Sequence, residues 1–205
     1  MRGCFMGDKY GAGQDPYTYE NSNVLINNFN IRDESILDEA ERELSTVAAM
    51  DIEFALPPYD LNYLCELHRK LFSDLFSWAG CIRTIDISKG NTRFCNVSYI
   101  NKESARIFTQ LKNDNYLEGL PLDTFIKKMA EYYCDINVLH PFREGNGRTQ
   151  RVFFEHLAIN CGYNLNFSGV TAEEWVHANI HGYHCNYKPM ENLLHRCLQS
   201  VEKLS

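Results

Sequence analysis

No run of apolar residues in this 205-residue chain reaches the ~18 that a membrane-spanning helix needs. The first residues, MRGCFMGDKYGAG, also lack the ~7 to 15 apolar residues of a secretion signal. Positive charge is scarce, since 20 Lys and Arg stand against 27 Asp and Glu, for a net charge of −7. We therefore expect a cytoplasmic protein that binds no membrane and has no broad basic surface for nucleic acid.

Closely paired cysteines are also absent. None of the eight cysteines forms a C-x-x-C pair, and most of them lie within apolar runs. Because a chain of this length can be stabilised by a hydrophobic core, we expect reduced thiols rather than disulfides. The group His177, His181, His184 and Cys185 has the chemistry of zinc ligands, but no second ordered pair or carboxylate accompanies it. Metal binding there is the weaker interpretation, and packing or surface roles are favoured for His68 and His156.

The composition, with 44% hydrophobic residues, is that of a globular protein, and no repeat or linker divides the chain. Gly, Asn and Tyr dominate the beginning, so we expect residues 1–32 to form an irregular arm packed on a single globular unit, residues 33–205. Helical periodicity predicts a mainly α fold. The predicted helices cover residues 33 to before 57, 61–75, 103–111, 122–139, 149–160, 172–183 and 190–201, with Asp33 and Asp60 as N-caps.

The period changes from about four to two between Arg83 and Val97. Ile85 and Ile87 alternate with polar residues, and Gly90-Asn91 supplies a turn before a second short run. This pattern predicts one β-hairpin. A lone hairpin is marginally stable, so we expect it to lie on the surface of the helical body.

The candidate catalytic and anion-binding residues form one segment, HPFREGNGRTQR, from His140 to Arg151. Pro141 ends the preceding apolar helix. Gly145, Asn146 and Gly147 accept positive φ, and they precede a helix expected to begin near Gly147 or Arg148. Backbone N–H groups of such a loop and the helix N-terminus form an anion site. A mere linker is a poor explanation of so many ionisable side chains beside an apolar helix.

The side chains of this segment match phosphate transfer. Arg148 and Arg151 are three residues apart, so they share a helix face from which both can bind phosphate oxygens. Glu144 suits an anion site only if its carboxylate holds a cation such as Mg²⁺. His140 has the pKa of a general base that takes a proton from an attacking hydroxyl.

This segment resembles the signature H-x-F-x-[DE]-G-N-G-R-x-x-R of the Fic family at every defining position. The stretch ISKGNTRFCN resembles the family's flap hairpin, and DPYTYENSNVLINNFNIRD resembles the segment that precedes the core in Fic toxins and bacterial effectors. The resemblance implies a Fic fold, a helical bundle with one β-hairpin flap. It also implies a bacterial protein adenylyltransferase that moves AMP from ATP to a Ser, Thr or Tyr hydroxyl of a target protein.

The resemblance also implies a role for each matching residue. His140 would deprotonate the target hydroxyl, Phe142 would anchor the loop in the core, and Glu144 would bind Mg²⁺. Gly145, Asn146 and Gly147 would form the anion hole. Arg148 and Arg151 would bind the β- and γ-phosphates. The expected contacts of the flap with target or nucleotide are Lys89, Gly90 and Asn91. Trp175, Asn179 and Tyr183, at steps of four, are candidates for an adenine wall, although such stripes more often belong to a core.

Many Fic proteins carry an inhibitory motif [ST]-x-x-x-E-[GN], and this chain has no full match to it. The nearest stretch, Ser35 to Ala40, ends in Ala where Gly or Asn is required. The resemblance therefore implies a toxin restrained by a small separate antitoxin, whose helix would bring a glutamate to Arg151. The ATPase subunits of DNA gyrase and topoisomerase IV are the implied targets.

Three alternatives remain at this point. The chain could be a host-directed effector domain, a Fic enzyme with another transfer such as phosphorylation, or an inactive binding module. The resemblance also leaves Met6 as a second candidate start of translation.

Overall fold

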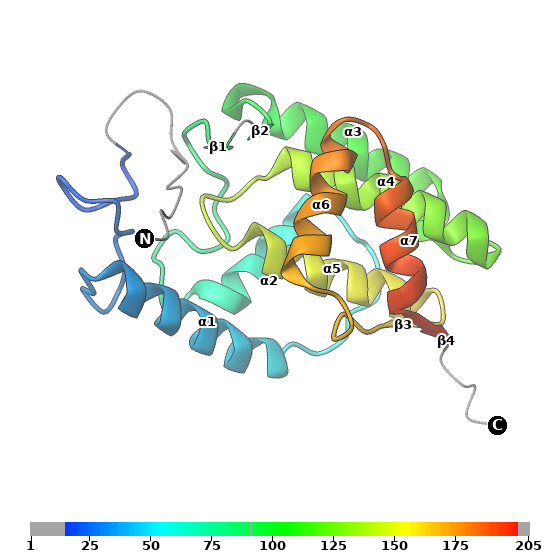
Figure 1. Ribbon diagram of the computed structural model, residues 1–205, viewed down its shortest axis with the longest axis horizontal. Coiled ribbons are helices and arrows are strands. Elements are labelled where there is room, and N and C mark those ends of the chain that lie inside the picture. Colours follow the sequence, from blue (N-terminus) through cyan, green and yellow to red (C-terminus); the bar gives the residue numbers. More distant parts are fainter. Residues whose placement is uncertain (1–14, 91, 201–205) are drawn as a thin grey trace.

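The computed structural model describes residues 15–90 and 92–200, with the side chains of 199 and 200 excepted. Seven helices and four short strands follow one another in the described residues (Figure 1). In chain order they are α1 (Glu34–Met50), α2 (Leu61–Phe72), β1 (Ser88–Lys89), β2 (Thr92–Arg93), α3 (Ile100–Asn113), α4 (Leu122–Leu139), α5 (Asn146–Asn160), β3 (Tyr163–Leu165), α6 (Ala172–Tyr183), α7 (Lys188–Cys197) and β4 (Leu198–Ser200). The predicted mainly α fold is confirmed.

The first two helices begin at the predicted caps. The Asp33 carboxylate accepts hydrogen bonds from the N–H groups of Ser35, at 2.9 Å, and Ile36, at 3.1 Å. The Asp60 carboxylate accepts one from the N–H of Tyr63 at 2.8 Å. Each cap satisfies N–H groups that have no partner within the helix, which is worth about 1 kcal/mol.

The core is built around α4, which contacts α3, α5, α6 and α7. Phe125, Met129 and Tyr133 of this helix are at most 1% exposed. In Figure 1, α1 lies at one edge of the molecule and α3 at the other, while α6 and α7 lie across the middle. The loop between α4 and α5 therefore follows a helix at the centre of the core.

Residues 15–32 form no helix and cover one side of α2. Their backbone makes one isolated bridge, between Thr18 and Leu25. Tyr19 and Leu25 are buried, and the guanidinium of Arg32 lies 3.5 Å from the centre of the Tyr19 ring. The rest of the predicted arm, including Met6, lies outside the described residues.

The β structure differs from the prediction in two ways. The hairpin is present, but each strand has only two residues, with Ser88 opposite Arg93 and Lys89 opposite Thr92. A second small antiparallel sheet, β3 with β4, ends α7 at Cys197, where a helix to residue 201 was predicted. Three-residue strands far apart in the chain leave no periodic signal, so the sequence could not predict their pairing.

The seven described cysteines, residues 65, 81, 95, 134, 161, 185 and 197, are all free thiols. Cys4 lies outside the described residues. Within residues 15–90 and 92–200, the helices are too short or too polar to span a bilayer.

Candidate active site

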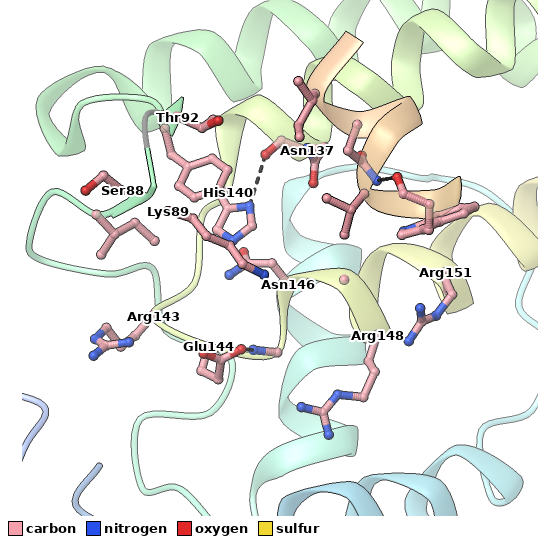
Figure 2. A pocket seen from close by; sticks show the side chains of 18 residues that line it. Ser88, Lys89, Thr92, Asn137, His140, Arg143, Glu144, Asn146, Arg148 and Arg151 are labelled. Atoms are coloured by element: carbon pink, nitrogen blue, oxygen red, sulfur yellow. Dashed lines mark hydrogen bonds between the residues drawn. The ribbon is translucent and has the colours of Figure 1, made fainter. Parts of the chain in front are cut away.

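The loop between α4 and α5 begins and ends in left-handed backbone. α4 stops at Leu139, His140 has φ 44°, and Pro141 cannot continue the helix. Gly145 has φ 78° and caps α5, which begins at Asn146, slightly before the predicted start. The helix N-terminus consequently opens beside the His140 ring (Figure 2).

The Asn146 side chain closes this loop. Its Oδ1 accepts from the Phe142 N–H at 2.9 Å, and its Nδ2 donates to the Phe142 carbonyl at 2.8 Å. Phe142 is 1% exposed, and its ring stacks on His68 at 3.9 Å. The Asn146 side chain thus holds the Phe142 backbone, while its own backbone N–H is at the open start of α5.

His68 braces the loop from α2, a role that the sequence did not indicate. Its Nδ1 accepts from the Gly80 N–H at 2.8 Å, so Nε2 carries the proton and donates to the Glu144 carbonyl at 3.0 Å. Burial lowers the pKa of His68 to about 4. The ring is therefore neutral at pH 7, as these two hydrogen bonds require.

Gly145 is irreplaceable for a steric reason as well as for its φ. A Cβ at this position would collide with the Phe72 ring, with Cζ only 2.6 Å away. The Gly145 N–H donates to the Glu144 carboxylate at 3.1 Å. At Gly147, by contrast, a Cβ would meet nothing within 4 Å.

His140 has a defined tautomer. Its Nδ1 lies 3.0 Å from the Asn137 carbonyl, which can only accept, so Nδ1 carries the proton and Nε2 keeps a lone pair (Figure 2). The pKa of His140 is lowered to about 4, mainly by burial and further by the charges of Arg83 and Lys89. The Phe94 ring from the hairpin stacks on the imidazole at 3.7 Å. His140 is thus a neutral, oriented proton acceptor.

Arg148, in the first turn of α5, is held by partners on α1. Arg148 Nη1 donates to the Glu41 carbonyl at 3.0 Å and to Ser45 Oγ at 2.7 Å, and Nη2 pairs with the Glu41 carboxylate. Burial, together with the charge of Arg151, lowers the pKa of Arg148 to about 10. Its guanidinium is directed toward α1, a contact that the prediction of Arg148 as a β-phosphate ligand did not include (Figure 2). Its remaining N–H groups have to serve any anion in the pocket.

One cavity of about 390 Å³ collects most of the predicted residues. This volume is within the usual range for small-molecule sites. Its walls come from the hairpin, from the end of α4, from the loop with the start of α5, and from α6. The lining residues are Ile87, Ser88, Lys89, Thr92, Phe94, Asn137, His140, Arg143, Glu144, Gly145, Asn146, Gly147, Arg148, Arg151, Trp175, Val176, Asn179 and Ile180.

Three predicted residues are not among these. Asn91 lies outside the described residues, and Gly90, at the hairpin tip, does not line the cavity. Tyr183 does not line it either, because it lies eight residues beyond Trp175, or about 12 Å along the helix axis. Of the three residues predicted to form an adenine wall, Trp175 and Asn179 line the cavity and Tyr183 does not.

Val176 and Ile180 of α6 line the cavity in place of Tyr183, and both are 49% exposed. Their four-residue spacing is visible in the sequence. It is the same spacing as in the predicted stripe of Trp175, Asn179 and Tyr183, one position earlier. The ring of Trp175 also packs against Tyr133 at 5.1 Å, so it belongs partly to the core. The Asn179 Oδ1 is buried with no hydrogen-bond partner among the described residues.

The histidines beyond this wall make no metal centre in the described structure. The rings of His177 and His181 are 4.4 Å apart, and His181 Nδ1 lies 3.1 Å from the Asn186 amide. Within residues 15–90 and 92–200, no three His, Cys, Asp or Glu side chains gather in a way that could hold an ion.

The helical fold and this cavity thus place the open N-terminus of α5 beside a neutral histidine. The model of the Fic/DOC family matches residues 58–158. The chain is 44% identical over 177 residues to a probable protein adenylyltransferase Fic of Salmonella typhimurium, covering 86% of this chain and 88% of that protein. The chain belongs to the Fic/DOC family and is a nucleotidyltransferase.

Solved structures agree with this assignment. The ADP-bound Fic domain of a Bartonella quintana effector protein has a TM-score of 0.84 and 31% identity, covering 92% of this chain and 96% of that chain. The BepC effector protein of Bartonella tribocorum, with bound AMPPNP, has a TM-score of 0.83 and 28% identity, covering 90% of this chain and 96% of that one. The predicted Fic fold is confirmed.

Proposed function

We propose that this chain transfers AMP from ATP to a hydroxyl group of a target protein, with His140 as the general base. One observation carries the proposal: a neutral imidazole, with its Nδ1 proton donated to the Asn137 carbonyl, lines the same cavity as residues 144–147, the anion loop. The target oxygen attacks the α-phosphorus while its proton passes to His140 Nε2. The bond from the α-phosphorus to the bridging oxygen breaks, and pyrophosphate leaves.

The triphosphate binds at the start of α5. The N–H groups of Asn146 and Gly147, with the helix dipole, form the anion hole. The Gly145 N–H joins them once the nucleotide replaces its contact with Glu144. Arg151 binds the γ-phosphate. Arg148 binds the β-phosphate through the N–H groups that α1 does not use. Because the fork of Arg148 is held in place by Glu41 and Ser45, it needs no reorganisation when the nucleotide arrives.

The base of the nucleotide binds against α6. Val176 and Ile180 supply an apolar surface beside Trp175. Asn179 Oδ1, buried without a partner among the described residues, matches the exocyclic amine of adenine, which is a hydrogen-bond donor. Such an acceptor favours adenine over guanine, whose corresponding group is a carbonyl oxygen.

Mg²⁺ is a further element of the proposal. Glu144 offers a hard carboxylate donor beside the anion loop, and Mg²⁺ is commonly bound by one or two carboxylates together with substrate phosphates. The donor chemistry therefore fits this ion, with Glu144 as its protein ligand. When bound, Mg²⁺ would neutralise phosphate charge.

The hairpin is proposed to hold the target. Its strands β1 and β2 pair only with each other in the described residues, so an extended target segment can add to a strand edge. Lys89 lines the cavity and is proposed to contact the nucleotide or the target. Gly90 is proposed to contact the target or the nucleotide as well, and the same proposal for Asn91 concerns a residue outside the described ones.

In the cell, we propose a bacterial toxin that acts in the cytoplasm on the ATPase subunits of DNA gyrase and topoisomerase IV. A separate antitoxin would insert a glutamate at Arg151, because the nearest internal stretch, Ser35 to Ala40, lacks the required Gly or Asn. Incubation of each purified subunit with α-labelled ATP tests the target. Label on neither subunit, alongside label on another protein, contradicts this part of the proposal.

A host-directed effector is the second candidate, because solved neighbours such as BepC are effector proteins. It predicts labelling of a protein in animal-cell lysate rather than in bacterial lysate. Phosphate transfer differs from AMP transfer in the position of the label that reaches the protein. An inactive binding module transfers no label.

The deciding experiment compares α- and γ-labelled ATP in bacterial lysate, using wild type, His140→Ala and the control His177→Ala on the exposed side of α6. We expect protein labelling from the α-position alone, lost in His140→Ala and retained in His177→Ala. Labelling from the γ-position indicates a kinase. No labelling by wild type from any nucleotide contradicts catalysis.

A further inference from the structure

A fully buried cation, Arg83, joins the hairpin to the end of α4. The residue is 1% exposed, and its Nε donates to the His140 carbonyl at 2.8 Å. Nη1 donates to the Ile85 carbonyl at 2.6 Å, and Nη2 donates to the Cys95 carbonyl. The backbone N–H of Arg83 donates to the Pro141 carbonyl at 2.9 Å. One side chain thus contacts both legs of the hairpin and the backbone of the proposed base.

Removing this charge from water costs free energy, which has to be offset by an opposite charge or by hydrogen bonds. The nearest carboxylate is that of Asp86, 3.8 Å from Nη1 and 38% exposed, so charge neutralisation is weak. Backbone carbonyls satisfy the guanidinium instead. Only arginine has several donors in one rigid plane that reach three separate chain segments at once, which lysine cannot do.

Arg83 replaces a β-ladder that the hairpin lacks. β1 and β2 are paired over only two residues each, and one more hydrogen bond, from the Phe94 N–H to the Ile87 carbonyl at 3.3 Å, follows. Below it the guanidinium joins the two legs. The Cys95 N–H donates to the Val138 carbonyl at 2.9 Å, which holds the second leg on α4. The same leg carries Phe94, whose ring stacks on His140.

We propose that Arg83 is a positioning residue that fixes the hairpin and the His140 backbone as one unit. The inference rests on the proposed function, because it assumes that His140 takes a proton from a hydroxyl presented by the hairpin. His140 occupies left-handed backbone, and its carbonyl is held by Arg83 Nε. Without this link, the hydroxyl and Nε2 vary in separation, and misplacement by about 1 Å can lower a rate about 100-fold.

The phosphate-binding part of the cavity is held by contacts outside this link. The anion loop is held by Asn146, Phe142 and His68, and Arg148 is held by α1. Neither set of contacts includes Arg83. The structure therefore predicts that loss of the Arg83 guanidinium lowers the rate of transfer and leaves ATP affinity intact.

The test compares wild type with Arg83→Lys and Arg83→Gln, and uses Arg106→Lys, at an exposed ion pair of α3 and α4, as the control. We measure kcat with target peptide or lysate, the Kd of ATP by calorimetry, and amide hydrogen exchange. We expect kcat about 10- to 100-fold lower in both variants, with partial rescue by Lys over Gln. The Kd of ATP should stay within about twofold, and the Cys95 amide should exchange faster while α5 is unchanged.

Equal loss of ATP affinity and kcat, or wild-type kcat and exchange, overturns the role of Arg83. If wild type transfers nothing, the proposed function fails, but the exchange measurement still tests the link on its own. Should both Arg83 variants fail to fold, Asp86→Asn gives a milder test, because Asp86 accepts from Asn96 and the Val97 N–H at the surface of the same junction. It should show the same separation of kcat from ATP affinity, and wild-type kcat in this variant contradicts the proposal.

Discussion

Two imidazoles, the buried His68 and the partly buried His140, support the loop in their neutral forms. Each uses Nδ1 or Nε2 in a hydrogen bond that fixes its tautomer, and burial lowers the pKa of both to about 4. An unfolded chain titrates these rings near 6.5. Below that pH the unfolded state binds protons that the folded state does not, so acidification favours unfolding.

This difference predicts the pH dependence of stability. The free energy of unfolding should fall as the pH falls from about 6.5 to about 4, by up to about 1.4 kcal/mol per pH unit for each histidine. His68→Asn should be less stable at pH 7 but lose less on acidification, because one of the two rings is gone. Urea titrations from pH 7.5 to 4.5 measure both curves. Parallel curves for wild type and variant would refute the assignment.

The residues of the loop could be predicted because they are contiguous in the sequence. His140, Glu144 and the glycines carry their chemistry within twelve positions, and the structure brings them into one cavity. Arg83 and His68 reach the same loop from 57 and 76 residues away. A single sequence carries no signal for such pairings, because neither residue differs in type or spacing from one that packs elsewhere.

At the scale of elements, the join between the loop and α5 is the most sharply constrained. Gly145 combines positive φ with the Phe72 ring against its α-carbon, whereas Gly147 has open space and helical backbone. Two glycines of one motif thus differ in what they tolerate.

Gly145→Ala should therefore lower the free energy of unfolding by at least about 2 kcal/mol, through left-handed strain and overpacking against Phe72. Gly147→Ala, the matched control, should change it by less than about 1 kcal/mol. Thermal unfolding followed by circular dichroism gives both values. Equal destabilisation of the two variants would show that the Phe72 contact does not set the loop.

Helix boundaries were predicted better than strands. Apolar periodicity gave α4 and α6 to the residue, since both have long regular stripes and clear ends. The hairpin was predicted too long because alternation continues below the two paired residues, where Arg83 takes the carbonyls that a ladder would use. On α6 the prediction named the stripe that ends at Tyr183, whereas Val176 and Ile180, one position further on, also line the cavity. Both stripes repeat every four residues, so spacing alone does not distinguish them.

Over the whole molecule, the arm and the loop are joined by a buried ion pair. Arg143 Nε and Nη2 donate to Asp15 Oδ2 at 2.9 and 2.7 Å, across 128 residues of sequence. The two side chains are 1% and 6% exposed. The net charge of −7 accordingly coexists with a local concentration of arginines around one cavity.

Asp15→Asn should lower the free energy of unfolding by about 3 kcal/mol, because it removes one charge of a buried ion pair. Glu20→Gln, at an exposed position of the same arm, should change it by less than about 0.5 kcal/mol. Urea unfolding at pH 7 measures both variants. A loss equal to that of the control would mean that the arm contributes nothing to the stability of the loop.

We infer that nucleotide binding, at the start of α5, and proton abstraction, by His140, are carried by different residues of one cavity. The direct test is the rate of α-label transfer by His140→Ala at an ATP concentration that calorimetry shows to be saturating. We predict ATP affinity within about threefold of wild type and a rate at least about 100-fold lower. Transfer at the wild-type rate by the nucleotide-saturated variant would contradict the account.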